Sequence, residues 1–559
     1  MSTISTARTV LPPSVATKSA CEIRADLLAR REIALLDVRE EAAHAEGHPL
    51  FAANLSLSWL ELEIYARVPR PKTPIVVFDD GEGLAIQAAA RLADLGYSDV
   101  KLMEGGIQGW RNAGYELFHD VNAPSKAFGE LVESQRHTPS LSAQEVKALI
   151  DSGADIAIVD VRRFDEFQTM SIPTATSVPG AELVLRIGAL ARRPETKIIV
   201  NCAGRTRSII GAQSLINAGI RQPVAALRNG TIGWKLAGQT LDLGQSRRFP
   251  AADDKAQIDA AIAARRVADR AGVKRIDLET VERWIDRGES TLYRFDVRTP
   301  DEYLAGHLPG FRNVPGGQLV QETDIYASVR GASIVLADDR GVRADMTASW
   351  LRQMAWDVFV LDFPANGSFS NTYFTERGEW RAPLPALPRL PEGTLISAER
   401  LKEWLDRSNW SQQESRGADV RDVVVLDLAP SPQYARSHIP GSWFALRFRL
   451  SEAFYAAAGA GRYVLTSSDG VAARFAYAEA NKLVSAPVYM LDGGTAEWAR
   501  SGGELTSADP KYASRPVDRY KRPYEGTDAS TSAMQAYLDW ESGLVEQLER
   551  DATHGFHVI

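Results

Sequence analysis

Short runs of apolar, β-branched residues recur along the chain and alternate with longer segments whose apolar positions follow a helical spacing. This alternation is typical of α/β domains with a mostly parallel sheet. Four of these runs share an acidic residue at the strand end, namely Asp37, Asp160, Asp296 and Asp427. Because the intervals are 123, 136 and 131 residues, the pattern predicts four copies of one domain. A solenoid would repeat every 20–50 residues or so.

Within each copy a second apolar run follows the first, and three copies then carry a phrase that combines glycine with tryptophan. These phrases are Gly105–Trp110, Asn229–Trp234 and Gly493–Trp498, whereas the third copy has Asp362–Gly367 in this place. The opening helix is marked by a capping-box signature in two copies, at Ser19 with Glu22 and at Ser142 with Glu145. The repeated order of elements predicts one α/β fold used four times.

Composition changes between the copies predict where the domains meet. The charged, alanine-rich segment Asp253–Ala271 predicts a linker helix. An extended spacer before the fourth copy is predicted by Pro383, Pro385, Pro388 and Pro391. We therefore expect four domains, followed by a tail at 511–559. The expected domains are 1–122, 123–250, 251–385 (which includes the linker helix) and 386–510.

The tail carries an apolar stripe at helical spacing. Its members are Met534, Tyr537, Leu538, Leu544, Val545 and Leu548. The stripe predicts an amphipathic helix that docks on a domain face, with binding of a separate partner as the alternative.

The composition, 45% hydrophobic and 24% charged, is that of an ordinary globular protein. A net charge of −8 argues against nucleic acid or another polyanion as a general partner. No apolar run reaches the ~18 residues of a membrane span, and the first residues lack a secretory signal pattern. The two cysteines, Cys21 and Cys202, exclude a disulfide scaffold. We expect a cytoplasmic protein that does not contact membranes.

The residue at the tip of the second strand decides which copy can carry out thiol chemistry. Counting from the strand-end aspartates, these positions are Asp79, Cys202, Asp338 and Ser467. The interval is 42 residues in the first three copies and 40 in the fourth. Only the second copy therefore has a thiol there. Cys21 falls in the first turn of an opening helix, and we interpret it as structural.

The segment after this cysteine reads Cys202-Ala203-Gly204-Arg205-Thr206-Arg207-Ser208, followed by a helix from Ile209 that stops at Gly219. A cysteine between a strand end and a helix N-terminus lies among unpaired backbone N–H groups and the positive end of the helix dipole. We therefore expect its pKa to fall below the usual value. The two arginines would add charge-assisted donors for an oxyanionic sulfur compound.

Together, the four strand-end aspartates, the loop after Cys202 and the glycine–tryptophan phrases resemble the rhodanese-like sulfurtransferase family, in a bacterial four-domain arrangement. The resemblance implies four tandem rhodanese-like domains, of which the first, third and fourth are inactive. It also implies that Cys202 carries sulfane sulfur as a persulfide within a loop formed by Ala203, Gly204, Arg205, Thr206, Arg207 and Ser208. Asp160 and Arg162 match the first-strand pair that braces the loop.

The resemblance further implies a small sulfur donor such as thiosulfate, an acceptor such as cyanide or a thiol, and no cofactor or metal. A protein acceptor is a further partner class. One departure concerns a histidine turn, present as His307–Gly310 and His438–Gly441. The active copy has Ser171–Thr174 instead, so no role of that histidine applies.

Several alternatives stay open at this point. A cysteine phosphatase needs an arginine six positions after the cysteine, where this chain has Ser208. Cys202 could also be a small buried core residue, and Arg205 and Arg207 a solvated pair. Because three copies lack the thiol, the chain could instead be a non-catalytic interaction scaffold. The carboxylates at the equivalent positions cannot carry sulfane sulfur.

Overall fold

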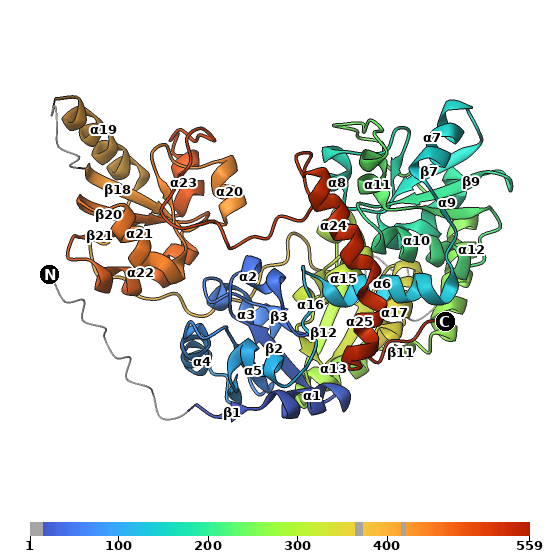
Figure 1. The fold of residues 1–559 in the computed structure, drawn as a ribbon. Coiled ribbons are helices and arrows are strands. Elements are labelled where there is room, and N and C mark those ends of the chain that lie inside the picture. The colour runs from blue at the N-terminus through green and yellow to red at the C-terminus, as the bar shows by residue number, and fades with distance from the viewer. Residues whose placement is uncertain (1–14, 364–372, 415–420) are drawn as a thin grey trace.

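The computed structural model describes residues 15–363, 373–414 and 421–559. These residues form four α/β units, each with a mostly parallel sheet between helices (Figure 1). The predicted fold class is thus confirmed. Two segments used in the sequence analysis, the first residues of the chain and 364–367 of the third phrase, lie outside the described residues.

The second unit has the strand order β6-β10-β9-β7-β8, with every neighbouring pair parallel. Its strands are β6 (Ser140–Leu141), β7 (Ile156–Asp160), β8 (Thr176–Ser177), β9 (Lys197–Asn201) and β10 (Val224–Leu227). Its helices are α7 (Ala143–Asp151), α8 (Phe164–Thr169), α9 (Leu183–Leu190), α10 (Thr206–Asn217) and α11 (Gly230–Leu236). The carboxyl ends of β7 and β9 lie side by side, since Asp160 pairs with Asn201.

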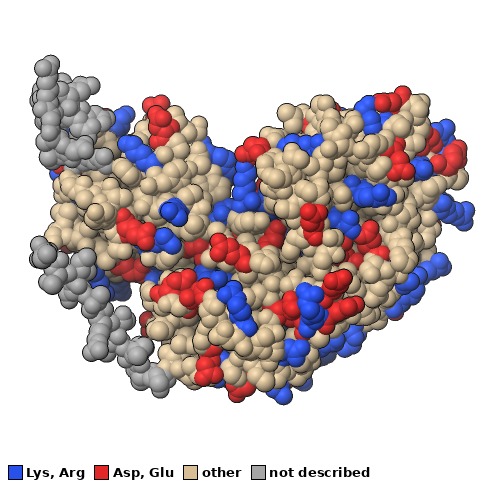
Figure 2. All heavy atoms as spheres, in the orientation of Figure 1, with Lys and Arg blue, Asp and Glu red and all other residues tan. Residues whose placement is uncertain are grey.

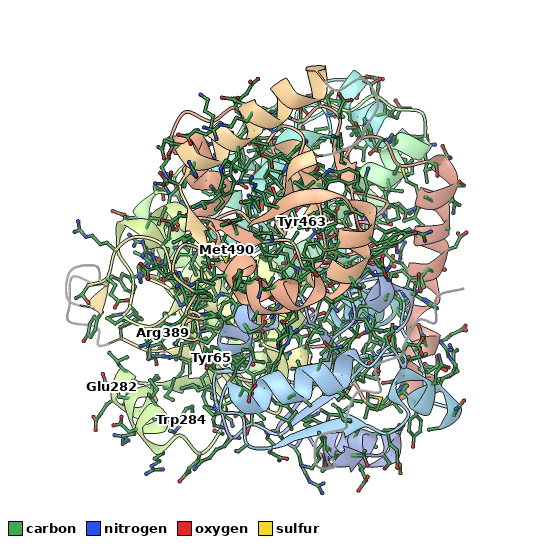
Figure 3. The ribbon with its side chains drawn as sticks, turned by 90° about the vertical axis from the view of Figure 1, so that its left-hand side faces the viewer. Tyr65, Glu282, Trp284, Arg389, Tyr463 and Met490 are labelled. Atoms are coloured by element: carbon green, nitrogen blue, oxygen red, sulfur yellow. The ribbon has the colours of Figure 1, made fainter. Side chains whose placement is uncertain are left out.

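The third and fourth units repeat this order. The third has β11 (Lys274–Ile276), β16 (Asp357–Leu361), β15 (Ser333–Ala337), β12 (Leu292–Asp296) and β13 (Arg312–Asn313). The fourth has β17 (Leu395–Ile396), β21 (Val488–Leu491), β20 (Ala460–Thr466), β18 (Arg421–Asp427), β19 (Trp443–Phe444) and β22 (Lys511–Tyr512). Tyr463 on β20 and Met490 on β21 point into the core of the fourth unit (Figure 3).

The sheet of the first unit is completed by another unit. Its own strands are β1 (Thr17–Lys18), β5 (Val100–Met103), β4 (Ile75–Phe78), β2 (Ile33–Asp37) and β3 (Ala53–Asn54). Strand β14 (Val329–Arg330) of the third unit pairs antiparallel with β2. Because this strand covers an edge of β2 that would otherwise offer unpaired backbone groups, the first and third units are joined through one sheet.

The capping boxes and the linker helix predicted from the sequence are present in the structure. Both capping boxes are formed, at Ser19 before α1 (Ala20–Leu28) and at Ser142 before α7. The linker helix is α12 (Asp254–Arg270), capped by the Asp253 side chain. The proline-rich spacer has no regular secondary structure. Between the first two units the sequence marked no element, yet a helix, α6 (Ala123–Arg136), lies there.

The C-terminal tail forms two helices instead of the single one expected, α24 (Thr531–Ser542) and α25 (Leu544–Asp551). Gly543 lies between them. Glycine has the least favourable helix propensity after proline, which favours a break at this residue. The apolar stripe is buried as predicted, apart from the half-buried Val545. Figure 1 shows both helices lying across α6, with α24 reaching α11 of the second unit.

Charged side chains of both signs are interspersed over the face shown in Figure 2. This distribution agrees with the moderate net charge of −8. In the part of the chain that the structure describes, no helix is both long and apolar enough to cross a membrane.

Candidate active site

Cys202 directly follows β9, at the sheet edge where the strand-end Asp160 also lies. It is 2% exposed. The next helix, α10, begins at Thr206, three residues earlier than the sequence suggested. Arg207 and Ser208, the last residues of the expected loop, therefore lie on the first helical turn, and only the residues from Cys202 to Arg205 precede the helix.

The same backbone contact occurs at the strand tip of all four units. The N–H of the sixth residue after the tip donates to the tip side chain. In the second unit this is the Ser208 N–H to the Cys202 sulfur. The other pairs are Ala85 N to Asp79 (3.0 Å), Ala344 N to Asp338 (3.3 Å) and Ala473 N to Ser467 (3.3 Å). Each strand tip is thus an anion-binding helix N-terminus.

In the thiol-free units the tip side chain itself accepts these backbone hydrogen bonds. Asp79 accepts a second backbone bond from Gly81 (3.1 Å). Asp338 accepts from the Arg343 N–H at 2.7 Å. A carboxylate in the first and third units, and the Ser467 hydroxyl in the fourth, therefore occupy the place where the second unit presents a sulfur atom.

A glycine of the glycine–tryptophan phrase packs directly against the backbone of the strand-tip residue. Gly230 has φ +53°, and a Cβ there would lie 2.3 Å from the Cys202 carbonyl oxygen. Gly106 and Gly494 occupy the same place over Asp79 and Ser467. Only glycine permits this approach. Trp234 itself is fully buried, and its indole N–H donates to the Thr240 carbonyl (2.8 Å), so it is a core residue.

Asp160 and Arg162 form a buried ion pair below the loop. The Arg162 Nε donates to Asp160 Oδ1 (2.9 Å) and its Nη2 to Oδ2 (2.7 Å). Arg162 also donates to the Met170 carbonyl (2.6 Å), and the Asn201 amide donates to Asp160 Oδ2 (2.8 Å). Because Asn201 immediately precedes Cys202, the pair fixes the strand end from which the loop departs.

Both loop arginines are paired with carboxylates. Arg205 makes a bidentate contact with Glu130 of α6 (2.8 and 2.8 Å), and it also pairs with Glu133. Arg207 makes a bidentate contact with Glu166 of α8 (2.8 and 2.9 Å). Their side chains are 17% and 15% exposed, so the reading of a solvated pair is wrong. Neither guanidinium presents an uncompensated charge.

The family model of the Rhodanese-like domain matches residues 22–113, 142–237, 277–363 and 397–501. The chain belongs to the rhodanese-like family. It is similar to the crystal structure of a thiosulfate sulfurtransferase from Pseudomonas aeruginosa, with 59% identity and a TM-score of 0.92. The match covers 98% of this chain and 100% of that chain.

Two single-domain structures also match parts of this rhodanese-like chain. One is the BH2092 protein from Bacillus halodurans, with 22% identity and a TM-score of 0.17, covering 20% of this chain and 81% of that chain. The other is the Alr3790 protein from Anabaena sp., with 22% identity and a TM-score of 0.17, covering 19% and 83%. Comparison with curated proteins gave no match.

The expectation of a lowered cysteine pKa is wrong for this structure. Burial raises the pKa of the Cys202 thiol. The Arg207 charge and the Ser208 hydrogen bonds lower it, but they do not outweigh the desolvation. The sequence argument assumed an open loop, whereas here the loop is covered and a carboxyl group, Glu541, lies near the sulfur.

Sequence reasoning missed the residues that cover the rhodanese-like loop, because they come from distant segments. Glu130 and Glu133 lie on α6. This helix packs closely against the start of α10 at Gly129, where a Cβ would lie only 2.8 Å from the Thr206 side chain. Tyr537 and Glu541 lie on α24. Of these, only Tyr537 had a signal, as part of the buried stripe. Among the described residues, no three His, Cys, Asp or Glu side chains are arranged to hold a metal ion.

A small cavity of about 40 Å³ lies between the second and third units and is lined in part by Arg207. Its lining is mostly small and apolar, with Gly180 and Gly211 from the second unit and Gly316 and Gly317 from the third.

Proposed function

We propose that this chain is a sulfurtransferase in which Cys202 takes sulfane sulfur from thiosulfate or a similar donor and passes it to cyanide or a thiol. The observation that carries the proposal is the lone strand-tip thiol at a helix N-terminus, in a chain 59% identical to a thiosulfate sulfurtransferase. The predicted boundaries, 1–122, 123–250, 251–385, 386–510 and 511–559, remain our proposal for the domains and tail.

The reaction requires two displacements at sulfur. The Cys202 thiolate attacks the sulfane sulfur of thiosulfate, a new S–S bond forms, and sulfite leaves with the electron pair of the broken S–S bond. The acceptor nucleophile then attacks the outer sulfur of the persulfide, and Cys202 leaves as a thiolate. No electrons are gained or lost overall, so the proposal requires no redox cofactor and no metal.

The site supports these steps through its backbone and its fixed charges. The helix N-terminus at Ser208 favours an anionic sulfur on Cys202. Arg207 adds a positive charge near that sulfur. The loop from Ala203 to Thr206 supplies further backbone N–H groups. Cyanide, a low-molecular-weight thiol or a protein thiol would be the acceptor.

Thiocyanate formation from thiosulfate and cyanide by the full chain tests the proposal. Sustained turnover by the wild-type chain is the expected result. Absence of turnover with thiosulfate and with other sulfane donors would instead favour the interaction scaffold, the alternative that the three thiol-free units support.

Removing the Arg207 charge is expected to slow reactions of the Cys202 thiolate. The positive charge lowers the pKa of the thiol, so Arg207→Ala should raise this pKa and leave Glu166 with only its contacts to Arg163. Alkylation by iodoacetamide at pH 8 should slow about tenfold, the effect of one pKa unit. Arg207→Lys should restore most of the rate, and the exposed Arg192→Ala should match the wild type. Equal rates for the wild type and Arg207→Ala would contradict this role.

Restoring a thiol to an inert unit should give little sulfur transfer. We expect Asp338→Cys, Asp79→Cys and Ser467→Cys, each combined with Cys202→Ser, to form persulfide at least about 100-fold more slowly than the wild type. Asp338→Cys in the third unit should form persulfide fastest of the three, because Arg343 there contacts Glu302 in the same way as Arg207 contacts Glu166. Activity of Asp79→Cys near the wild-type level would show that the thiol alone distinguishes the units.

A further inference from the structure

Helix α24 of the tail lies directly on the sulfur-transfer loop. A Cβ at Gly204 would be 3.1 Å from the Tyr537 ring and 3.4 Å from Glu541 Oε2. Thr206, the first residue of α10, donates to Glu541 Oε1 (3.5 Å). Gly204 in the loop and Thr206 at the start of α10 thus both contact a tail segment that is remote from them in the sequence.

The two carboxyl oxygens of Glu541 have different surroundings. Oε1 accepts from the Tyr537 hydroxyl (2.7 Å) as well as from Thr206. Oε2 is buried and, within the described part of the chain, has no hydrogen-bond partner. This second oxygen is also the one nearest Gly204. An unpaired buried polar atom is therefore directed at the loop that surrounds the Cys202 sulfur.

The charged groups around Glu541 leave it without a counter-ion of its own. Lys126 of α6 pairs with Asp120 (2.8 Å), and its ammonium lies over the Tyr524, Tyr537 and Trp540 rings. Arg205 is held by two glutamates of α6, and one of them, Glu130, repels an ionised Glu541.

The neutral form of Glu541 fits this environment. A buried carboxylate with one bare oxygen beside another carboxylate is costly, whereas a protonated acid is neutral and can donate. Burial and Glu130 raise the pKa of Glu541 to about 8, against the opposing effects of Lys126, Tyr537 and Arg205. At neutral pH the Oε2 side can then carry a proton directed at the loop.

We propose that Glu541, in its neutral form, is a hydrogen-bond donor of the sulfur-transfer site, directing its Oε2 hydroxyl at the anionic sulfur species held at Cys202. This inference rests on the proposed function and assigns the tail a part in it. Because both arginines are already paired with carboxylates, the backbone N–H groups and this acid are needed beside the Arg207 charge to hold an anionic donor such as thiosulfate. Ionisation of Glu541 would turn a donor into a repelling charge.

Variants of Glu541 test this role in the full chain. Glu541→Gln keeps the size, the neutrality and a donor, so at pH 7 its kcat/KM for thiosulfate should stay within a few-fold of the wild type. Glu541→Ala removes the donor and should lower kcat/KM about tenfold or more. Gln535→Ala, an exposed residue on the same helix, is the matched control and should leave kcat/KM unchanged.

The pH profile separates this role from a purely structural one. An ionised Glu541 also raises the pKa of the Cys202 thiol, so both effects of ionisation slow the wild type alone. The ratio of the Glu541→Gln rate to the wild-type rate therefore reports on Glu541. The ratio should be flat below about pH 7 and rise toward about tenfold per pH unit above about pH 8. A flat ratio from pH 6 to 10, or a wild-type kcat/KM at pH 7 in Glu541→Ala, would overturn the proposal.

The measurement also distinguishes this inference from the proposed function. If wild-type protein forms no persulfide with thiosulfate at any pH, the proposed sulfurtransferase function fails. If wild-type protein forms persulfide and Glu541→Ala forms it equally fast, only the role of Glu541 fails.

Discussion

Replacing Cys202 by serine is expected to abolish sulfur transfer from thiosulfate to cyanide while leaving the fold intact. Serine differs by one atom, so the 2% exposed site can hold it without a cavity or a clash. The hydroxyl, however, cannot form a persulfide under these conditions. Since every other strand tip carries a carboxylate or a hydroxyl, no other unit can replace the lost thiol. The measurement is thiocyanate formation at saturating thiosulfate.

The other cysteine provides the control. Cys21 is exposed on α1 of the first unit, far along the chain from the loop. Cys21→Ser should therefore turn over at the wild-type rate. Persistent turnover in Cys202→Ser, together with its loss in Cys21→Ser, would move the active site to the first unit.

Replacing Asp160 by alanine is expected to cause the largest loss of stability among single changes near the site. Asp160 is fully buried and is the bidentate partner of Arg162, whose side chain is 1% exposed. Removing the carboxylate leaves a buried guanidinium without its counter-ion, and breaking such a pair costs about 3–5 kcal/mol. The measurement is the free energy of unfolding from urea denaturation.

The exposed Asp165→Ala, on a side chain that is 70% exposed, is the control and should change the free energy of unfolding by less than about 0.5 kcal/mol. Because the Asn201 amide also donates to Asp160, the strand end before Cys202 should loosen and sulfur transfer should fall in parallel. A loss below about 1 kcal/mol for Asp160→Ala would show that the pair does not brace the loop.

Much of the fold could be predicted because it depends on local pattern. Apolar runs, capping boxes and the recurring strand-end aspartate identified four copies of one α/β unit, and the strand-tip comparison singled out Cys202. These features need only residues close together in the sequence. The Asp160–Arg162 pair was expected from the resemblance to the rhodanese-like family alone, and the structure contains it.

The environment of the loop could not be predicted, since it is formed by remote segments. Glu130 and Glu133 contribute negative charge to a site that the sequence suggested was positive, and Glu541 adds a carboxyl group near the sulfur. Burial of the sulfur also reverses the expected direction of the Cys202 pKa. Likewise, strand β14 completes the sheet of the first unit from the third, a pairing for which a two-residue strand gives no sequence signal.

The inert units contribute to the architecture of the chain. The third unit forms one wall of the cavity beside the loop through Gly316 and Gly317, and its Arg343 reaches Glu182 of the second unit (2.9 Å). The fourth unit contacts the first through Arg447 and Glu61 (2.7 and 3.0 Å). These contacts give the thiol-free units a structural role beside the unit that carries Cys202.

The intact mass of the full chain after incubation with thiosulfate tests the central claim most directly. The account predicts that wild-type protein gains the mass of one sulfur atom, that peptide mapping places it on Cys202, and that cyanide removes it as thiocyanate. Cys202→Ser should gain nothing under the same conditions. An unchanged wild-type mass, or a sulfur atom found on Cys21, would contradict the account.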